Sequence, residues 1–174
     1  MKNALPLAAA VSLATLLSAC ATTQTAGPSA TARLEGRSGT QVAGTVSFRQ
    51  EGQLVRVEAQ VRGLTPGEHG FHIHEAGDCS APDASSAKGH FNPGNKPHGR
   101  HGEMSHHAGD MPNLVADAYG NAAFAGTLTQ VSVSSGPDGI VGRSVVIHAD
   151  PDDYKSQPAG NSGKRVACGV IGGL

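Results

Sequence analysis

Hydrophobic and polar residues alternate along several short stretches of the chain. The clearest stretch covers residues 53–61, where an apolar side chain stands at every second position from Val55 to Val61. A period of two is typical of a strand with one buried face. Related patterns predict further strands around residues 42–48, 71–73, 114–118, 122–128, 143–148 and 166–171.

Turn residues separate these stretches and indicate the architecture. Gly63-Leu-Thr-Pro-Gly67 is a turn cluster, and Tyr119-Gly-Asn121 is typical of a hairpin turn. No window of about 12 residues, the mean length of a helix, shows a helical period after the N-terminal segment. We therefore predict an all-β domain of about eight short strands, an antiparallel sandwich or barrel. Two long segments, 75–112 and 149–164, interrupt the strands, and such loops in a compact domain are usually functional.

Length and composition narrow the function classes. The chain has 174 residues, including 24 Gly, four Phe, two Tyr and no Trp. This length suits one domain with a short appendage, and many glycines agree with short strands joined by tight turns. The formal net charge is −1 and only 16% of residues are charged, so the basic footprint of a nucleic-acid-binding protein is missing.

The first 19 residues have the features of a signal peptide. Lys2 precedes an apolar run from Ala4 to Leu17, which is shorter than the ~20 residues that a membrane span needs. The run leads into Leu17-Ser18-Ala19-Cys20, which resembles a bacterial lipobox. In such signals the Cys is acylated on sulfur and cleavage occurs just before it, so we predict a lipidated Cys20. The alternative is an ordinary signal peptide whose small-residue cleavage site happens to precede a Cys.

These features divide the chain into three parts. Residues 1–19 are assigned to the lipoprotein signal peptide, residues 20–31 to the lipidated Cys and a flexible tether, and residues 32–174 to one folded domain. Export would place the domain in the periplasm or at the cell surface, in an oxidising compartment where a disulfide persists. Ala21 after the Cys favours the outer membrane where the cell has one.

Histidines are the unusual feature of the composition. Eight of the nine lie within residues 69–107, and the ninth is His148. Residues i and i+2 of a strand project to the same face, so His72 and His74 should point together, away from the core. His148 ends another predicted strand. Three imidazoles supplied by rigid strands could hold one metal outside the barrel.

The first long loop adds a second group of metal-binding side chains. His90, His98, His107 and Asp110 form a His/Asp combination that suits Zn²⁺. Taken singly, each histidine is also compatible with a surface or packing role, and residues 98–107 could be a loose metal-sequestering tract. The paired strand histidines, the spaced loop residues and the distant strand histidine together favour a built metal centre.

Five sequence runs are spread over most of the domain: Gly70-Phe-His-Ile-His-Glu75, Gly89-His-Phe-Asn-Pro93, His107-Ala-Gly-Asp110, Gly142-Arg-Ser-Val-Val-Ile-His148 and Arg165-Val-Ala-Cys-Gly-Val-Ile171. Together, and in this order, they resemble the bacterial copper/zinc superoxide dismutases. The resemblance implies a Greek-key, eight-stranded β-sandwich or barrel with two long functional loops.

The resemblance also implies one copper ion and one zinc ion per chain, joined by His90 as a bridging imidazolate. The family's spacing favours His98 over His101 and His107 over His106 as zinc ligands. We therefore interpret His69, His101 and His106 as non-ligands. The implied ligands are His72, His74, His90 and His148 for copper, and His90, His98, His107 and Asp110 for zinc.

Further residues match supporting positions of the family. Asp152 matches a buried carboxylate that hydrogen-bonds a copper ligand and a zinc ligand, here His72 and His98, although it could also be a plain turn aspartate. Cys79 and Cys168 match the intrasubunit disulfide. Arg165 matches the arginine that stands beside the open copper position and pairs with the anionic substrate.

The implied activity is the dismutation of superoxide to dioxygen and hydrogen peroxide, by alternate reduction and oxidation of the copper ion. His90 would deliver a proton in the second half-reaction, and the enzyme would protect the extracytoplasmic compartment from oxidative damage. The segment between His148 and Arg165 is shorter than in the eukaryotic enzymes, so their guide residues have no match. The candidates for steering superoxide here are Lys88, Lys155 and Lys164.

Two other classes of protein are compatible with these motifs. One is a lipoprotein of the same fold that sequesters copper and zinc or delivers copper, and the other is a structural surface lipoprotein with a degenerate site. Loss of the zinc group or of the arginine would favour them, but this chain keeps both. The expected partners are superoxide and a membrane reached through the N-terminal lipid, and no nucleic acid is expected. The bacterial members include monomers and dimers, so the sequence is compatible with a monomer and with a homodimer.

Overall fold

The computed structural model describes residues 27–174. The signal peptide, Cys20 and most of the predicted tether lie outside the described residues, and within them no helix has the length and hydropathy needed to cross a membrane. A single short 3-10 turn, η1 (Ser85–Ala87), accompanies the strands in this part of the chain. The strands are β1 (Ser29–Gly36), β2 (Ala43–Glu51), β3 (Leu54–Arg62), β4 (Gly67–His69), β5 (Phe71–His74), β6 (Leu114–Ala116), β7 (Ala122–Leu128), β8 (Ser144–His148) and β9 (Arg165–Gly173).

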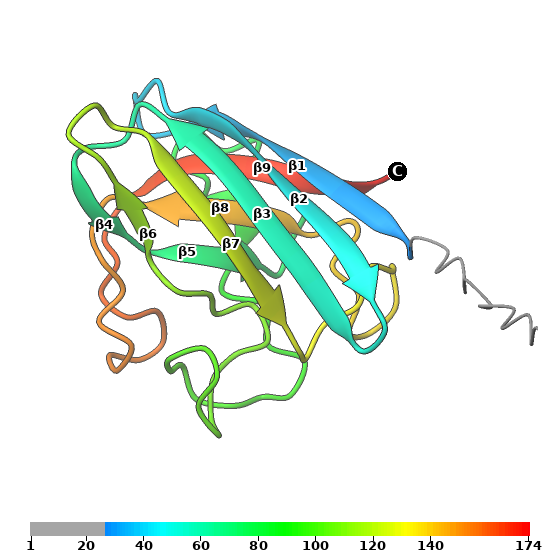
Figure 1. Cartoon of the computed structure of the whole chain (residues 1–174). Coiled ribbons are helices and arrows are strands. Elements are labelled where there is room, and N and C mark those ends of the chain that lie inside the picture. Colours follow the sequence, from blue (N-terminus) through cyan, green and yellow to red (C-terminus); the bar gives the residue numbers. More distant parts are fainter. Residues whose placement is uncertain (1–26) are drawn as a thin grey trace, which may run out of the picture.

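Most strands form one antiparallel sheet that curls around the core (Figure 1). Seven strands follow the order β5-β8-β9-β1-β2-β3-β7, and β4 pairs with β6 in a separate two-stranded sheet. Phe71 on β5 and Phe124 on β7 belong to the two edge strands of the large sheet, yet their ring centroids lie only 5.6 Å apart. The sheet therefore closes on itself into a sandwich or barrel, which confirms the predicted all-β class.

The alternating pattern of the sequence places the core. Along β3 every second residue is buried, from Val55 to Val61, and the residues between them are exposed. The register Val46↔Ala59 and Phe48↔Val57 aligns the buried face of β2 with that of β3. One continuous apolar core fills the space between the two halves of the sheet.

The first strand begins earlier than the sequence suggested. β1 starts at Ser29, so residues 29–31 belong to the sheet, although we assigned them to the tether. Ala30 and Ala32 are fully buried, and β1 pairs with both β2 and β9. Small alanines give little hydrophobic contrast along the sequence, so the buried face of this strand could not be recognised from the pattern alone.

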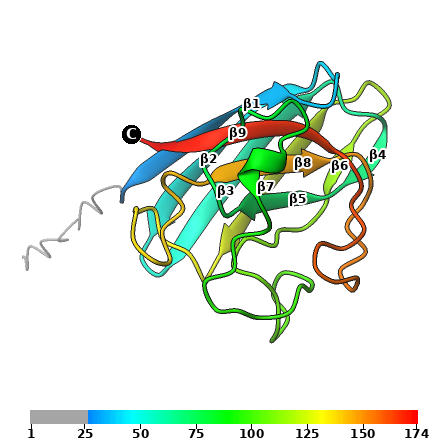
Figure 2. The same ribbon diagram turned by 180° about the vertical axis from the view of Figure 1, so that it is seen from behind.

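The two long irregular segments lie next to each other beside β5 and β8 (Figure 2). Cys79 in the first of them forms a disulfide with Cys168 of β9, with Cα atoms 5.7 Å apart, which confirms the predicted pairing. Cys79 and Cys168 also contact a small second cluster that contains Val146 and the alanines around η1. The cross-link therefore holds the beginning of the first loop against the sheet.

Truncation of a core residue tests this packing. Phe48 is 1% exposed on β2, and we expect Phe48→Ala to lower the free energy of unfolding by about 3–5 kcal/mol through lost contacts and a cavity. Thr45→Ala, on the exposed face of the same strand, should change it by less than about 0.5 kcal/mol. Denaturant unfolding of the metal-free domain measures both values. Equal losses for the two variants would contradict the packing.

Candidate metal centre

Strand geometry positions three of the predicted ligands. On β5, Phe71 and Ile73 point into the core, while His72 and His74 point to the opposite side. His148 ends β8 at a register irregularity between Ile147 and His148, a feature that commonly redirects a side chain. All three histidines are at most 4% exposed because the two long loops cover this face of the sheet.

The first loop brings its ligands to the free edge of β5. Phe91 N–H donates to the Ile73 carbonyl at 2.8 Å, and Ile73 N–H donates to the Gly109 carbonyl at 2.9 Å. Isolated β-bridges pair His74 with His90 and His72 with Asp110. The edge of the rigid sheet therefore sets the backbone positions of two loop ligands.

The side chains gather into two groups whose ligand atoms lie within 4.8 Å of one another. His90 belongs to both, and its ring centroid lies 3.9 Å from that of His72. Residues 27–174 contain no further group of this kind. The groups are His72, His74, His90 and His148, and His90, His98, His107 and Asp110.

Several buried ring nitrogens in these groups have no hydrogen-bond partner, namely Nδ1 of His72, Nε2 of His90, and Nδ1 of both His98 and His107. The last two lie 3.1 and 3.3 Å from Asp110 carboxylate oxygens without the alignment of a hydrogen bond. Unpaired buried polar atoms are costly unless something else binds them. Converging imidazole nitrogens suit copper, and imidazoles with a carboxylate suit zinc. The residues present therefore fit the two metals.

The remaining nitrogens of the strand histidines are held by backbone carbonyls. Nδ1 of His74 donates to the Lys88 carbonyl at 2.9 Å. Nδ1 of His148 donates to the Gly163 carbonyl at 3.3 Å. Each contact fixes which ring nitrogen carries the proton and leaves Nε2 free for a metal. The Nε2 atoms of the two rings indeed face each other at 3.4 Å.

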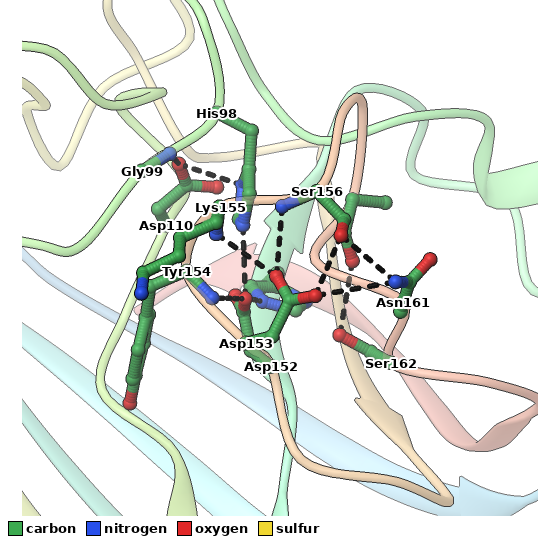
Figure 3. Close-up of polar contacts among 12 residues, drawn as sticks. His98, Gly99, Asp110, Asp152, Asp153, Tyr154, Lys155, Ser156, Asn161 and Ser162 are labelled. Carbon is green, nitrogen blue, oxygen red and sulfur yellow. Dashed lines mark hydrogen bonds and ion pairs between the residues drawn. The ribbon is translucent and has the colours of Figure 1, made fainter.

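A single carboxylate connects the two groups. Asp152 accepts a hydrogen bond from His72 Nε2 on one oxygen at 2.7 Å and from His98 Nε2 on the other at 2.9 Å. The three side chains are fully buried. Figure 3 shows His98 between Asp110 and Asp152. Asp152 therefore has the two histidine contacts that the sequence analysis assigned to it, and it also accepts from Tyr154 N–H at 2.7 Å, as a turn aspartate does.

The pKa values of His72, His74 and Asp110 fit metal-binding protonation states, whereas His98 must lose a proton to bind a metal. Burial lowers the pKa of His72 and His74 well below the usual value, and the nearby His90 ring lowers it further. Burial would raise the pKa of Asp110, but the polar contacts of its carboxylate with the rings of His107, His90 and His98 hold it far below its usual range. For His98, burial is outweighed by the contacts with the Asp110 and Asp152 carboxylates, which raise the pKa to about 9, so this ring is protonated near neutral pH until a metal displaces the proton. Neutral imidazoles and an ionised carboxylate are the forms that bind metals.

The other histidines lie outside both groups. Nδ1 and Nε2 of His69 lie 2.8 Å from the His148 and Thr65 carbonyls, so this ring braces the backbone on the far side of His148. His106 contacts the His107 carbonyl and the Gln130 side chain. His101 packs against His106, with ring centroids 5.1 Å apart.

Arg165 lies beside the group that contains His148. Its guanidinium donates to the Ala84 carbonyl at 2.7 Å and to the Lys88 carbonyl at 2.6 Å. Arg165 and His148 line one open cavity of about 380 Å³, together with residues 157–159 and 161–163. An anion that enters this cavity would meet a fixed cationic side chain next to the histidines.

Lys88 has an unusual backbone conformation at this place. Its φ of 64° and ψ of −149° fall in a region that costs a residue with a Cβ about 1–3 kcal/mol. In this conformation the Lys88 carbonyl accepts hydrogen bonds from both His74 and Arg165. The side chains of Lys88, Lys155 and Lys164 are exposed.

The sequence analysis missed two amide side chains that hold the second loop. Asn113 accepts from Asp152 N–H at 2.9 Å and donates to the Asp152 carbonyl at 3.0 Å. Gln157 makes the same pair of bonds with the backbone of His98. Both contacts join residues far apart in the chain, so no local pattern in the sequence announces them.

Comparison with known proteins agrees with this geometry. Residues 42–171 match the family model of copper/zinc superoxide dismutase. Superoxide dismutase [Cu-Zn] 2 of Aquifex aeolicus is 44% identical over 75% of this chain and 80% of its own length. Superoxide dismutase [Cu-Zn] 2 of Brassica juncea is 46% identical over 75% of this chain and 90% of its own.

Solved structures show the same likeness. A crystal structure described as the clock protein EA4 superposes with a TM-score of 0.76 at 42% identity. The match covers 84% of this chain and 94% of that chain.

Metal analysis tests the two groups. We expect about one copper and one zinc per chain in protein matured with both metals, because each group offers four converging ligands. Asp110→Ala should lose zinc first and keep part of its copper, since Asp110 belongs to one group only. His101→Ala, a nearby histidine outside both groups, should keep both metals. Zinc alone in wild-type protein matured with sufficient copper would contradict the assignment.

Proposed function

The chain belongs to the copper/zinc superoxide dismutase family and dismutes superoxide to dioxygen and hydrogen peroxide, and we propose that it does so outside the cytoplasm while anchored to a membrane. The observation that carries the residue roles is the pair of buried donor groups that share His90 beside Arg165. Copper would be held by His72, His74, His90 and His148, and zinc by His90, His98, His107 and Asp110.

The two metals would have different tasks. When bound, copper supplies the one-electron redox chemistry of the reaction, whereas zinc has no redox chemistry and organises its ligands. The protein contributes fixed imidazoles, because the strand backbone and the carbonyl contacts of His74 and His148 hold their rings before any metal arrives. Such a preformed shell limits rearrangement during turnover.

His90 is the group that can move a proton within the site. Its Nδ1 lies 2.8 Å from an Asp110 oxygen, and its Nε2 has no hydrogen-bond partner. Nε2 of His90 would therefore be the atom that takes up a proton and gives it to the reduced substrate. Nδ1 and Asp110 would both hold zinc, which would keep the ring in place while Nε2 alternates between its two states.

Arg165 would bind and orient the anionic substrate. Two backbone carbonyls hold its guanidinium at the cavity that it shares with His148. Burial lowers the pKa of Arg165, but a guanidinium stays protonated in proteins. A fixed charge in the wall of this cavity raises the local concentration of a small anion and favours it over neutral molecules. The exposed Lys88 next to it is suited to the same task.

Several observations support a location outside the cytoplasm. The leader ends in the lipobox-like run before Cys20, and the disulfide uses Cys79 and Cys168, the other two of the three cysteines. Disulfides persist in exported proteins and are rare in the cytosol. A lipidated Cys20 would hold the enzyme at the extracytoplasmic side of a membrane, and Ala21 favours the outer membrane where one is present. There it would remove superoxide before it damages the compartment.

Replacement of Arg165 distinguishes an enzyme from a protein that only stores metal. Arg165→Ala should keep copper and zinc, because the metal groups do not include Arg165. Turnover should fall about tenfold or more, since a charge-assisted contact is worth roughly 1.5–3 kcal/mol and tenfold equals ~1.4 kcal/mol. Arg165→Lys should lose less, because it keeps the charge without the planar fork.

The measurement is pulse-radiolysis or stopped-flow turnover at matched metal content over a series of salt concentrations. Wild-type rates should fall with added salt as steering is screened over a Debye length of ~10 Å at 0.1 M. Wild-type turnover by Arg165→Ala would show that the role given to Arg165 is wrong.

Mass spectrometry and fractionation test the anchor. We expect Cys20 to carry a diacylglycerol group and the wild-type protein to remain with membranes, because two or more acyl chains anchor stably. Cys20→Ala should give soluble protein or uncleaved precursor with the Cys79–Cys168 disulfide intact. Release of wild-type protein without detergent, with an unmodified Cys20, would refute the lipid anchor.

A further inference from the structure

The side chain of Gln157 binds both backbone groups of a residue in the other long loop. His98 N–H donates to Gln157 Oε1 at 2.8 Å, and Gln157 Nε2 donates to the His98 carbonyl at 2.9 Å. These two bonds imitate one rung of a β-ladder. They also fix the orientation of the amide, because only its oxygen can face an N–H group.

The second loop therefore holds His98 at two places, its backbone and its ring. Gln157 holds its backbone, and Asp152 accepts from its ring Nε2 at 2.9 Å. The third contact, between His98 Nδ1 and Asp110, points into the second metal group. With the backbone and one ring nitrogen fixed, Nδ1 has a single direction available.

The segment that presents Gln157 is itself well ordered by hydrogen bonds. Asp153 accepts from the backbone N–H and the hydroxyl of Ser156 at 2.8 and 2.6 Å, and from the Asn161 amide at 3.2 Å (Figure 3). Gly160 packs so tightly that an added Cβ would collide with the Asp152 carboxylate and lie 2.8 Å from His98 Nε2. Gln157 is thus attached to a fixed turn, in contrast to a freely moving loop tip.

Asn113 provides an internal comparison. Its amide binds the backbone of Asp152 in the same way, which ties the second loop to the segment before β6. The link between Asp152 and His98 is therefore clamped at both backbones, one by Asn113 and one by Gln157. Of the two, Gln157 acts on a metal-binding residue directly.

From these contacts we propose that Gln157 is a positioning residue that sets how firmly the second metal group retains zinc. The proposal rests on the zinc assignment of the proposed function. Without the amide, the His98 backbone loses both partners and the ring can tilt away from Asp110. Residues that hold a metal ligand in this indirect way typically change metal affinity by about 10–100-fold when replaced.

Zinc transfer to a chromogenic chelator from the copper- and zinc-loaded protein tests this directly. Gln157→Met keeps the length of the side chain and removes both hydrogen bonds to His98, together with the bond from Gln157 Nε2 to the Lys155 carbonyl at 3.2 Å. It should release zinc about tenfold faster or more than the wild type, with the copper electron paramagnetic resonance spectrum unchanged at full zinc loading. Cobalt(II) placed in the zinc group should show shifted visible absorption bands, which a merely structural effect elsewhere would not produce.

Arg100→Ala is the matched control. The Arg100 guanidinium lies 4.1 Å from the Tyr154 ring centroid, so it also joins the two loops but does not touch His98. This variant should release zinc at the wild-type rate. Equal acceleration in Arg100→Ala and Gln157→Met would overturn the proposal, because loop docking in general would then be the cause. Wild-type zinc release by Gln157→Met would overturn it as well.

A second variant covers the case in which Gln157→Met does not fold. Gln157→Glu keeps the acceptor for His98 N–H and places a charged oxygen against the His98 carbonyl, so it should also release zinc faster. An unchanged rate in Gln157→Glu would contradict the proposal. Failure of the wild type itself to bind zinc or to dismute superoxide would refute the proposed function, whereas a zinc-binding, active wild type with an unaffected Gln157 variant would refute this inference alone.

Discussion

The buried carboxylate of Asp152 is the contact on which the arrangement of the site depends. One oxygen accepts from His72 on the sheet and the other from His98 in the first loop, and none of the three side chains is exposed. A buried charge is unfavourable unless it is paired and hydrogen-bonded. The second loop must therefore close over β5 in one position, because only there does Asp152 find both of its donors.

The sheet is the rigid base of the site, because Asp152 joins His98 of the first loop to His72 on β5. β5 is an edge strand, and its free side would expose unpaired backbone groups. The first loop covers this edge through the bonds of Ile73 to Phe91 and Gly109, and in doing so sets His90 and Asp110 beside the strand histidines. Protection of an edge strand and construction of a metal centre are thus achieved by the same backbone contacts. The disulfide and Arg165 hold the other part of that loop against β9.

Most of the architecture follows from local patterns in the sequence. The period of two around residues 53–61 predicted β3, and the spacing of His72 and His74 predicted one shared face. The start of β1 was misplaced because Ala30 and Ala32 give weak hydrophobic contrast. The predicted strand at residues 114–118 ends at Ala116, since the Asp117 carboxylate accepts from the backbone of Tyr119 and Asn121 and forms the turn.

The residues that hold the metal ligands in position were harder to predict from the sequence than the ligands themselves. Ligand types and spacings are visible along the chain, and resemblance to a family suggested a role for Asp152. The amides of Asn113 and Gln157 act on backbone groups 39 and 59 positions away, so only the folded chain reveals them. The strained backbone of Lys88 is likewise invisible in the sequence, because nothing in its neighbours requires a positive φ.

The central claim is that one chain holds two different metals in adjacent groups that share a histidine. Anomalous diffraction from crystals of the copper- and zinc-loaded protein, measured at both absorption edges, tests it most directly. The account predicts a copper peak among His72, His74, His90 and His148, and a zinc peak among His90, His98, His107 and Asp110. Zinc at both positions in protein supplied with both metals, or a peak for either metal without His90 as a ligand, would contradict it.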